Sequence, residues 1–482
     1  MSAPSLPRYQ QIAAAILDTI QAHALPAGHR LPSVRALAEQ HQVHVLTALQ
    51  AYRFLEQHQH VCSRPRAGFF VALPTYSAAV TTSHATESPR PTAASLVQVS
   101  GRVSQLLRLS ASDVQIQLHM AEAAGHLYPT QALGRRLQQR LQADPALLGA
   151  YFPEREQRRL RQAIQEWAQH GQLDLHEDEI LMTHGSTEAI QLALRVLTQP
   201  GDTVAVETPV YFGLLQTLEI LGLKALEIPC SLDEGLSPEA LEFALRHGPP
   251  VRCLIVVPHF QNPTGALMPE ANKKRILALA QQHQLTIIED DVFGDLHFTG
   301  ERPTPLKAWD RAGEVIYCAS FTKSFAPAFR LGWISGGRYH AQLEQLKVSS
   351  SYVTSPLMQA VLSDSLSSGL YARHLLKMRN VLARRCEEMR AWILACFPKG
   401  TRVSAPKGGL LVWVMCPEPL DTFALLEQAL DASMSFAPGR LFSAEARFSH
   451  CLRLNIAHPQ TLEWRAAIQH LGQLAQNYLR TV

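Results

Sequence analysis

Apolar residues recur along the chain in two patterns, which separate a short helical part from a long part of alternating strands and helices. Near the N-terminus, apolar positions at helical spacing predict helices over 34–40 and 45–57, joined by a short turn. From about residue 115, short apolar runs alternate with longer helical stretches. This alternation predicts an α/β fold with a mainly parallel sheet that helices cover on both faces.

The strands of the long part are expected where short apolar runs end in polar or turn residues. Helices are expected between them, for example over 187–197 and 270–282. After about residue 375 the pattern predicts a smaller α+β lobe with strands near 410–415 and 451–456. The strands predicted for the main sheet cover 203–207, 253–257, 286–289, 315–320 and 332–335.

Composition indicates where the two parts meet. Residues 74–95 are rich in Ser, Thr, Ala and Pro and have no useful hydrophobic period, which favours a linker. An ordered loop packed on the long part is the alternative. We therefore predict an N-terminal domain over 1–73, a linker over 74–114 and a C-terminal domain over 115–482.

Length and composition exclude several classes of protein. A chain of 482 residues is too long for one ordinary domain, and 46% apolar with 18% charged residues excludes disorder throughout. No apolar run reaches the ~18 residues that a bilayer span needs, and no signal peptide is recognisable, so no membrane partner is expected. The eight cysteines contain no CxxC pair, which favours reduced thiols in a cytoplasmic protein and predicts no metal site.

Charge is distributed unevenly along the chain. The formal net charge is +3, and the first 73 residues hold six Arg, no Lys and three acidic residues, whereas the remainder is balanced. A small basic module on a neutral body is typical of a nucleic-acid-binding domain. An excess of three positive charges is also ordinary for a small domain, so charge alone does not establish nucleic-acid binding.

The N-terminal helices have the layout of a DNA-reading module. In PAGHRLPSVR, Ser33 is placed to cap the first helix. The second helix is expected to turn Leu46, Leu49 and Leu55 inward. Helix, short turn and helix place the second helix in the major groove of DNA, and the following SRPRAGFFV predicts a basic wing.

Three segments carry a family resemblance: RLPSVRALAEQ, TALQAYRFLE and RPRAGFFV resemble the GntR family of winged helix-turn-helix regulators over residues 8–73. The resemblance implies that Arg35, Thr47, Arg64 and Arg66 contact a double-stranded DNA operator. One departure is His44-Val45, where many members carry Ser-Arg, so one contact to DNA is altered. A small helical scaffold or protein-interaction domain is the alternative.

Polar residues follow several strands of the long part. Lys323 follows the strand over 315–320, Asp290 ends the strand over 286–289, and Asn262 follows the strand over 253–257. The carboxyl ends of parallel strands meet at one edge of a sheet, where α/β proteins bind ligands. In order, the motifs HGSTEA, PVYFG, NPTG, EDDVFGDL, SFTKSFAPAFRLGW and RLNIA resemble class I/II aminotransferases of fold type I, which depend on pyridoxal 5'-phosphate (PLP), from about residue 115 to 480.

PLP needs a lysine that binds it covalently, a carboxylate at its ring nitrogen and a cradle for its phosphate. Lys323 is the expected lysine and Asp290 the expected carboxylate, while Asn262 would bond the phenolic oxygen and Tyr211 would stack on the ring. The phosphate would be held by residues that offer hydroxyl, amide or guanidinium groups, namely Gly185, Ser186, Thr187, Ser320, Thr322 and Arg330.

The resemblance implies two further roles. Arg453 would bind a substrate or effector carboxylate, and Tyr151 would reach the phosphate of a neighbouring subunit, which implies a homodimer. Two departures affect this site. Phe293 stands where these enzymes carry Tyr three residues after the aspartate, which removes one bond to the ring oxygen, and Glu156 replaces a glycine in the loop that follows Tyr151.

A GntR-type domain joined to an aminotransferase-like domain resembles the MocR subfamily of regulators. This resemblance implies a transcription regulator that senses PLP, an amino acid, or both, and that binds DNA accordingly. An active aminotransferase with an accessory DNA-binding domain is the main alternative, and a PLP storage protein without a DNA function is a third.

Overall fold

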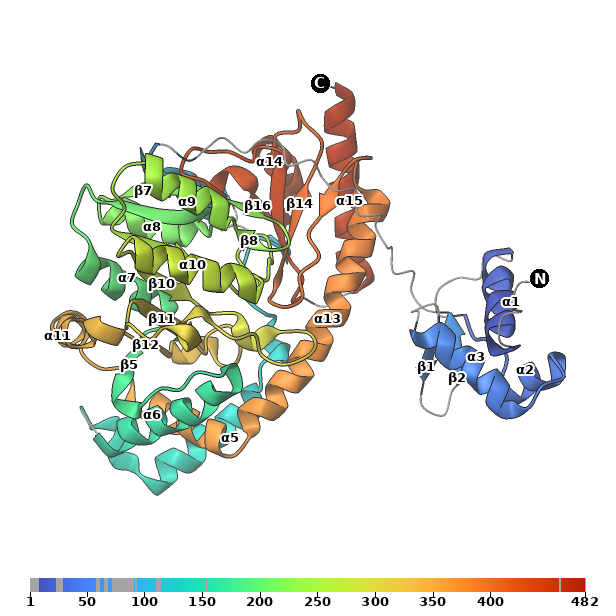
Figure 1. Ribbon diagram of the computed structural model, residues 1–482, viewed down its shortest axis with the longest axis horizontal. Helices are drawn as coiled ribbons and strands as arrows, with labels where there is room; N and C mark the ends of the chain where they lie inside the picture. The colour runs from blue at the N-terminus through green and yellow to red at the C-terminus, as the bar shows by residue number, and fades with distance from the viewer. Residues whose placement is uncertain are drawn as a thin grey trace. The chain divides into compact units, whose positions relative to one another are not determined.

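The computed structural model describes residues 8–22, 29–57, 61–64, 68–71, 91, 93–109, 114–151, 154–458 and 461–481. The chain forms two compact units, an N-terminal unit (Met1–Ser88) and a C-terminal unit (Pro89–Val482). Figure 1 draws both units and labels many of their helices and strands.

In its described residues, the N-terminal unit contains three helices and a two-stranded antiparallel sheet, and the bounds of α2 and α3 agree with the sequence prediction. Ser33 Oγ accepts a hydrogen bond of 3.2 Å from Ala36 N and so caps α2, as expected. The elements are α1 (Arg8–Ala22), α2 (Val34–Gln40), α3 (Val45–Gln57), β1 (Val61–Arg64) and β2 (Gly68–Val71).

One prediction about α3 is wrong. Leu55 is buried and Leu49 is half-buried, but Leu46 is 63% exposed. The buried residues of α3 form a stripe at helical spacing, consisting of Ala48, Ala51, Tyr52 and Leu55. A residue two positions before a member of such a stripe lies about 200° around the helix from it, so Leu46 faces away from the core.

The C-terminal unit is built on a nine-stranded sheet in the order β3-β7-β6-β9-β10-β11-β12-β5, with β8 paired to β7. Strands β7, β6, β9, β10 and β11 run parallel, whereas β3, β8 and β12 are antiparallel to their neighbours. The strands are β3 (Ser95–Leu96), β5 (Ile180–Thr183), β6 (Thr203–Thr208), β7 (Lys224–Ser231), β8 (Gly235–Leu236), β9 (Cys253–Val256), β10 (Thr286–Asp290), β11 (Val315–Ser320) and β12 (Gly332–Ser335).

Helices cover both faces of this sheet because successive strand residues point to opposite sides. In β6, Val204 and Val206 belong to the core that includes α7 (Ser186–Leu197) and α8 (Phe212–Ile220). Ala205, between them, belongs to a second core on the other face. That second core includes residues of α9 (Pro238–His247) and α10 (Glu270–Gln282).

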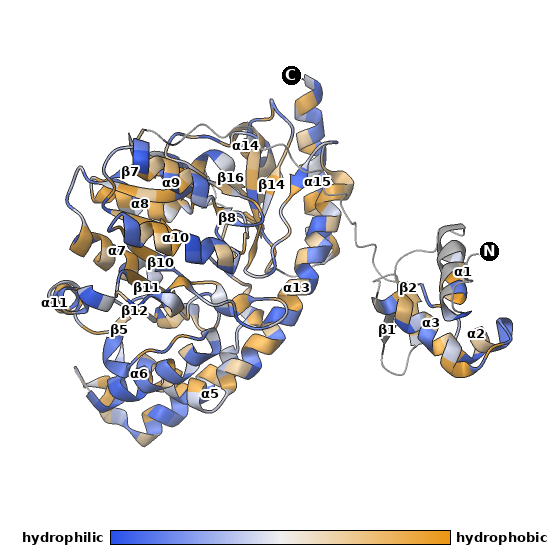
Figure 2. Cartoon of the chain, in the orientation of Figure 1, coloured by the Kyte–Doolittle hydropathy of each residue, from blue (hydrophilic) through white to orange (hydrophobic). Residues whose placement is uncertain are grey.

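The smaller lobe is an antiparallel sheet in the order β13-β14-β17-β16, and β15 (Met434–Ser435) pairs with β4 (Ile116–Gln117). Figure 2 shows β14 as apolar, whereas α6 is mostly polar. The strands are β13 (Arg402–Val403), β14 (Leu411–Met415), β16 (Ala437–Pro438) and β17 (Cys451–Asn455). The remaining helices are α4 (Ser100–Leu109), α5 (Thr130–Ala143), α6 (Glu154–Ala168), α11 (His340–Ser350), α12 (Pro356–Ser367), α13 (Leu370–Cys396), α14 (Thr422–Asp431) and α15 (Leu462–Thr481).

The predicted linker over 74–114 extends too far. Strand β3 and helix α4 lie within it, and Val103 and Leu106 of α4 are buried in the core of the C-terminal unit. Glu219 Oε2 accepts hydrogen bonds of 2.8 Å from the amides of Val99 and Ser100, which fixes the start of α4. Residues 72–90 lie outside the described residues, so the linker there and the boundary at residue 73 stay predictions.

Two sequence expectations concern the environment of the chain. Among the described helices, none is long and apolar enough to cross a membrane. The seven cysteines that the structure describes are free, which agrees with the expected reduced thiols.

Candidate cofactor and effector site

Lys323 follows β11 directly, in a short turn whose backbone is held by two side chains. His374 Nε2 lies 2.8 Å from the carbonyl oxygen of Ser324, and the Tyr128 hydroxyl lies 3.5 Å from that of Lys323. Both side chains are buried. The turn therefore presents Lys323 from a fixed backbone.

The surroundings of Lys323 favour its neutral amine. Burial lowers the pKa of Lys323, and the nearby cations Arg453 and Arg330 lower it further, while Glu122 and Asp290 act in the opposite direction. A neutral amine is the nucleophilic form of lysine. The same interactions indicate that the predicted lysine, aspartate and two arginines are gathered around one site.

Three residues predicted to bind phosphate lie against one another. Gly185 has a φ of +84°, and a Cβ built on it would lie 3.4 Å from an Arg330 guanidinium nitrogen and 3.6 Å from Thr322 Cγ2. The Arg330 guanidinium also donates to the carbonyl of His184 at 3.3 Å. The positive φ favours glycine at this position, and the Arg330 and Thr322 side chains border the space beside it.

The other predicted phosphate-binding residues border this cluster. Helix α7 begins at Ser186 and has no side-chain cap, so the amides of its first turn, at Ser186 and Thr187, remain available to an anion. The Ser320 and Thr322 hydroxyls lie 2.9 Å apart, and Ser320 Oγ accepts from the Thr322 amide at 3.1 Å. Hydroxyls, amides and a guanidinium are the groups that hold a phosphate.

Asp290 has an unused buried oxygen. Its Oδ1 is buried and has no hydrogen-bond partner among the described residues. Burial is the main reason that the pKa of Asp290 is raised to about 7; the neighbouring Asp291 raises it further, while Lys323 opposes the shift. A buried carboxylate oxygen without a partner is costly, and a donor such as a protonated ring nitrogen would satisfy it.

Arg453 is buried, and no carboxylate forms an ion pair with it within the described part of the chain. Its guanidinium donates to Asn262 Oδ1 at 3.0 Å and to the His119 carbonyl, whereas its Nε is buried without a partner. Burial lowers the pKa of Arg453 to about 10. Since a buried charge is normally paired, this environment fits the carboxylate of a bound ligand.

The two predicted tyrosines differ in position. Tyr211 is 37% exposed, and burial of its hydroxyl raises its pKa. Asp290 also raises this pKa, whereas Arg453 and Arg330 lower it. Tyr211 therefore borders the site. Tyr151 is 76% exposed, and its ring lies 5.3 Å from that of Tyr352, so it does not enter the site of its own chain.

The residues predicted to contact DNA are only partly described. Arg35 on α2 is exposed, and Thr47 on α3 is half-buried. Arg64 ends β1, but its side chain lies outside the described residues, as does all of Arg66. The roles of these four residues stay predictions.

The two departures from the aminotransferase pattern are both buried. Phe293 belongs to an apolar core and has no hydroxyl to offer to the site. Glu156 lies 3.3 Å from an Arg159 guanidinium nitrogen, and Arg140 and Arg159 both reach Asp364. Glu156 is therefore part of an ion-pair network that joins α5, α6 and α12.

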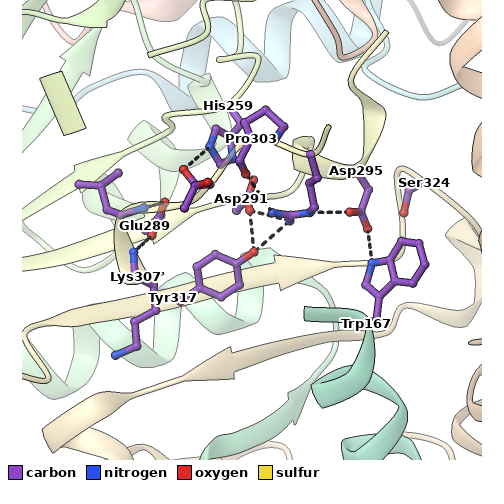
Figure 3. A network of polar contacts seen from close by, with 12 residues as sticks. Trp167, His259, Glu289, Asp291, Asp295, Pro303, Lys307, Tyr317 and Ser324 are labelled. Carbon is purple, nitrogen blue, oxygen red and sulfur yellow. Dashed lines mark hydrogen bonds and ion pairs between the residues drawn. The ribbon is translucent and has the colours of Figure 1, made fainter. Parts of the chain in front are cut away.

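A buried polar network behind the site was not predicted from the sequence (Figure 3). Asp291 accepts from the Tyr317 hydroxyl at 2.6 Å and from Arg302 at 2.7 Å, and it lies 2.7 Å from His259 Nδ1. Burial alone would raise the pKa of Asp291, but Arg302 and His259 outweigh it and hold this pKa well below its usual value. Asp291 is therefore ionised and fixed beside Asp290.

The network continues to the lysine turn. Arg302 Nε donates to Asp295 at 2.7 Å, and Asp295 also accepts from the Tyr371 hydroxyl at 2.6 Å. The same hydroxyl lies 2.8 Å from Ser324 Oγ. The neighbours of Asp290 and of Lys323 are thus joined by one chain of contacts. The acidic residues of EDDVFGDL were visible in the sequence, but their partners Arg302 and Tyr371 are not marked by any motif.

Together, the sheet, the strand-end lysine, the unpaired aspartate oxygen and the buried arginine define a transferase unit of fold type I, and the N-terminal unit is a winged helix-turn-helix. The chain belongs to the aminotransferase class I and II family, which residues 121–471 match. Residues 8–71 match the bacterial regulatory proteins of the gntR family. A chain that contains both of these domains has the domain arrangement of the MocR subfamily.

Proteins named as transcriptional regulators and proteins named as aminotransferases are both similar to this chain. The uncharacterized HTH-type transcriptional regulator YjiR of Escherichia coli K12 is 34% identical, over 97% of this chain and 98% of its own. Aromatic-amino-acid aminotransferase 1 of Thermococcus litoralis is 30% identical, over 79% of this chain and 93% of its own. The structure of LysN, the α-aminoadipate aminotransferase of Thermus thermophilus, in complex with N-(5'-phosphopyridoxyl)-L-leucine, has a TM-score of 0.73 and 28% identity, and the match covers 80% of this chain and 97% of that one.

Proposed function

We propose that the chain is a transcription regulator whose N-terminal unit binds operator DNA and whose C-terminal unit senses PLP, an amino acid, or both. Arg453 carries this proposal, because a buried guanidinium without a carboxylate partner in the described residues suits a ligand that brings a carboxylate. The family supports the DNA-binding function, and regulators such as YjiR match this chain over nearly the full length of both.

PLP is the cofactor of the C-terminal unit. When bound, it supplies an aldehyde that links covalently to an amine and a ring that withdraws electrons. Lys323, whose pKa burial lowers, would provide the amine that links to it, and Asp290 Oδ1, which is buried without a partner, would accept a hydrogen bond from the ring nitrogen. Gly185, Thr322 and Arg330 would hold its phosphate, with the Ser186, Thr187 and Ser320 groups beside them.

The other groups of the site orient the ligand. Arg453 would bind the effector carboxylate, and because its guanidinium donates to Asn262 Oδ1, the amide nitrogen of Asn262 would be left to donate to the ring oxygen. Tyr211 covers the ring. The exposed Tyr151 is free to serve a second subunit, so we infer a homodimer. A DNA-binding function places the protein in the cytoplasm.

We expect ligands of the C-terminal unit to change the affinity of the protein for DNA. A coupling free energy of ~1–3 kcal/mol changes that affinity by about 5–150-fold. An operator recovered by selection in vitro is titrated at one salt concentration with cofactor-free protein, with PLP-loaded protein, and with PLP-loaded protein plus each amino acid.

The matched variant for this titration is Arg453→Gln, which removes the buried cation but keeps a polar side chain. It is expected to retain PLP colour and basal DNA binding while losing any response to amino acids. Equal DNA affinity of the wild type in every ligand state contradicts the sensing function.

An active aminotransferase is the second candidate, because Lys323, Asp290 and Arg453 are all present and the relative from Thermococcus litoralis is named as an aminotransferase. Phe293 argues against it, since its ring leaves Asn262 alone to bond the ring oxygen. Steady turnover of an amino acid and a keto acid at ~1 per second or faster would favour the enzyme. Turnover far below this rate, with ligand-dependent DNA binding, favours the regulator.

A further inference from the structure

The first turn of α3 exposes two aliphatic side chains. Val45 is 43% exposed and Leu46 is 63% exposed, although both lie in the small N-terminal unit, where apolar residues are needed for the core. The amide of Leu46 donates to His44 Nδ1 at 3.4 Å, so the residue that departs from the family's usual Ser helps to begin the helix. Leu46 is therefore presented on an ordered turn.

The face of α3 that carries Leu46 is otherwise polar. Leu46, Gln50 and Arg53 follow one another at helical spacing (i, i+4, i+7), and all three are exposed. This stripe lies opposite the buried stripe that ends at Leu55. An apolar group, an amide and a guanidinium are thus aligned along one side of the helix, in that order from its N-terminus.

Such an order suits the major groove of DNA. A recognition helix presents its N-terminal residues to base edges. Amide and guanidinium groups find hydrogen-bond partners on base edges and phosphates, whereas an aliphatic side chain finds one apolar feature there, the 5-methyl group of thymine. A protein partner is less well matched, because two aliphatic side chains are far fewer than the ~20–30 residues a side of a stable interface.

We propose that Leu46 contacts the 5-methyl group of a thymine in each operator half-site, and so determines part of the sequence preference. This inference rests on the proposed DNA-binding function and names the base and the methyl group that Leu46 contacts. It also gives a reason for the exposure of a leucine that the core does not use.

Deoxyuridine tests the contact, since it differs from thymidine only by that methyl group. Each thymine of a selected operator is replaced singly, and affinities are measured by fluorescence anisotropy at fixed salt. Burying one methyl-sized group is worth ~0.8 kcal/mol, so replacing the contacted thymine of either half-site alone is expected to weaken wild-type binding about fourfold. For Leu46→Ala, the same replacement is expected to leave the affinity unchanged.

Two further variants serve as controls. Leu46→Met keeps an apolar side chain and is expected to retain the preference for thymine over deoxyuridine. Arg35→Gln is expected to weaken binding to the thymine operator and to the deoxyuridine operator by the same factor. Because Leu46 is exposed, Leu46→Ala is expected to keep the wild-type circular dichroism and melting midpoint.

Three outcomes count against the inference. Equal wild-type affinity at every thymine and deoxyuridine position contradicts it, and so does a Leu46→Ala variant that still discriminates the methyl group. In both cases the DNA-binding function itself stands. Absence of any sequence-selective DNA binding by the wild type overturns the proposed function and this inference together.

Discussion

Replacing Arg302 by methionine is expected to lower the free energy of unfolding of the C-terminal unit by about 3–5 kcal/mol. The Arg302 side chain is 10% exposed and donates to both Asp291 and Asp295 at 2.7 Å. Methionine fills much of the same volume but leaves two buried carboxylates without their shared cation. The midpoint and slope of urea-induced unfolding, followed by tryptophan fluorescence, measure the change.

The matched control is Arg275→Met, since Arg275 also bridges two carboxylates, those of Glu239 and Glu242, but at the surface. Exposed ion pairs contribute little, so this variant is expected to unfold nearly as the wild type does. Equal losses in the two variants would show that the buried network does not have the stabilising role assigned to it.

The effect of Arg302 is also expected to depend on pH with a defined sign. Burial opposes ionisation of Asp295, but Arg302 and Tyr371 outweigh it, so its pKa is lowered, as is that of Asp291. A carboxyl whose folded pKa is lowered contributes stability above its unfolded pKa of ~3.9 and loses it as pH falls through the folded value. The difference between Arg302→Met and wild type should therefore shrink below about pH 4.

The second large effect is expected for Asp290→Asn, which removes the carboxylate that we propose to face the ring nitrogen of PLP but keeps the shape of the side chain. A hydrogen bond to a charged group is worth ~1.5–3 kcal/mol, so the variant is expected to retain PLP about 10- to 150-fold less tightly. Equilibrium dialysis with the visible absorbance of the cofactor measures this. The exposed Asp174→Asn serves as the matched control and should retain PLP as the wild type does.

The cofactor-free Asp290→Asn variant separates a cofactor contact from a structural role. The folded pKa of Asp290 is about 7, above its unfolded value of ~3.9, so the wild type loses stability as pH rises between these values. Asparagine does not titrate, and the variant should therefore gain stability relative to the wild type from about pH 4 to about pH 8. A variant that loses stability at pH 8 but keeps its PLP affinity would contradict the assigned role.

Much of the fold could be predicted from the sequence because it is encoded locally. The predicted bounds of β11, β12, α2, α3 and α10 are those of the structure. Each is a short apolar run or a helical period that ends in residues with clear turn or capping preferences. The strand-end residues Lys323, Asp290 and Gly185 gather for the same reason, since parallel strands bring their carboxyl ends to one edge.

What could not be predicted depends on contacts between distant parts of the chain. Arg302 pairs with Asp291 and Asp295, but nothing in its own neighbourhood sets it apart from a surface arginine. Tyr371 is 76 residues from Asp295, to which it donates. The sequence does not distinguish helix α4 from the linker, because the apolar residues of α4 follow a Ser- and Pro-rich stretch.

The proposed sensing function depends on covalent attachment of PLP at Lys323, which borohydride reduction followed by peptide mapping detects. We expect a stable phosphopyridoxyl group on the peptide that contains Lys323, its loss in Lys323→Ala, and its retention in Lys399→Ala, a variant at an exposed lysine. Wild-type protein that stays colourless with PLP, or that carries the adduct only on other lysines, would contradict the account.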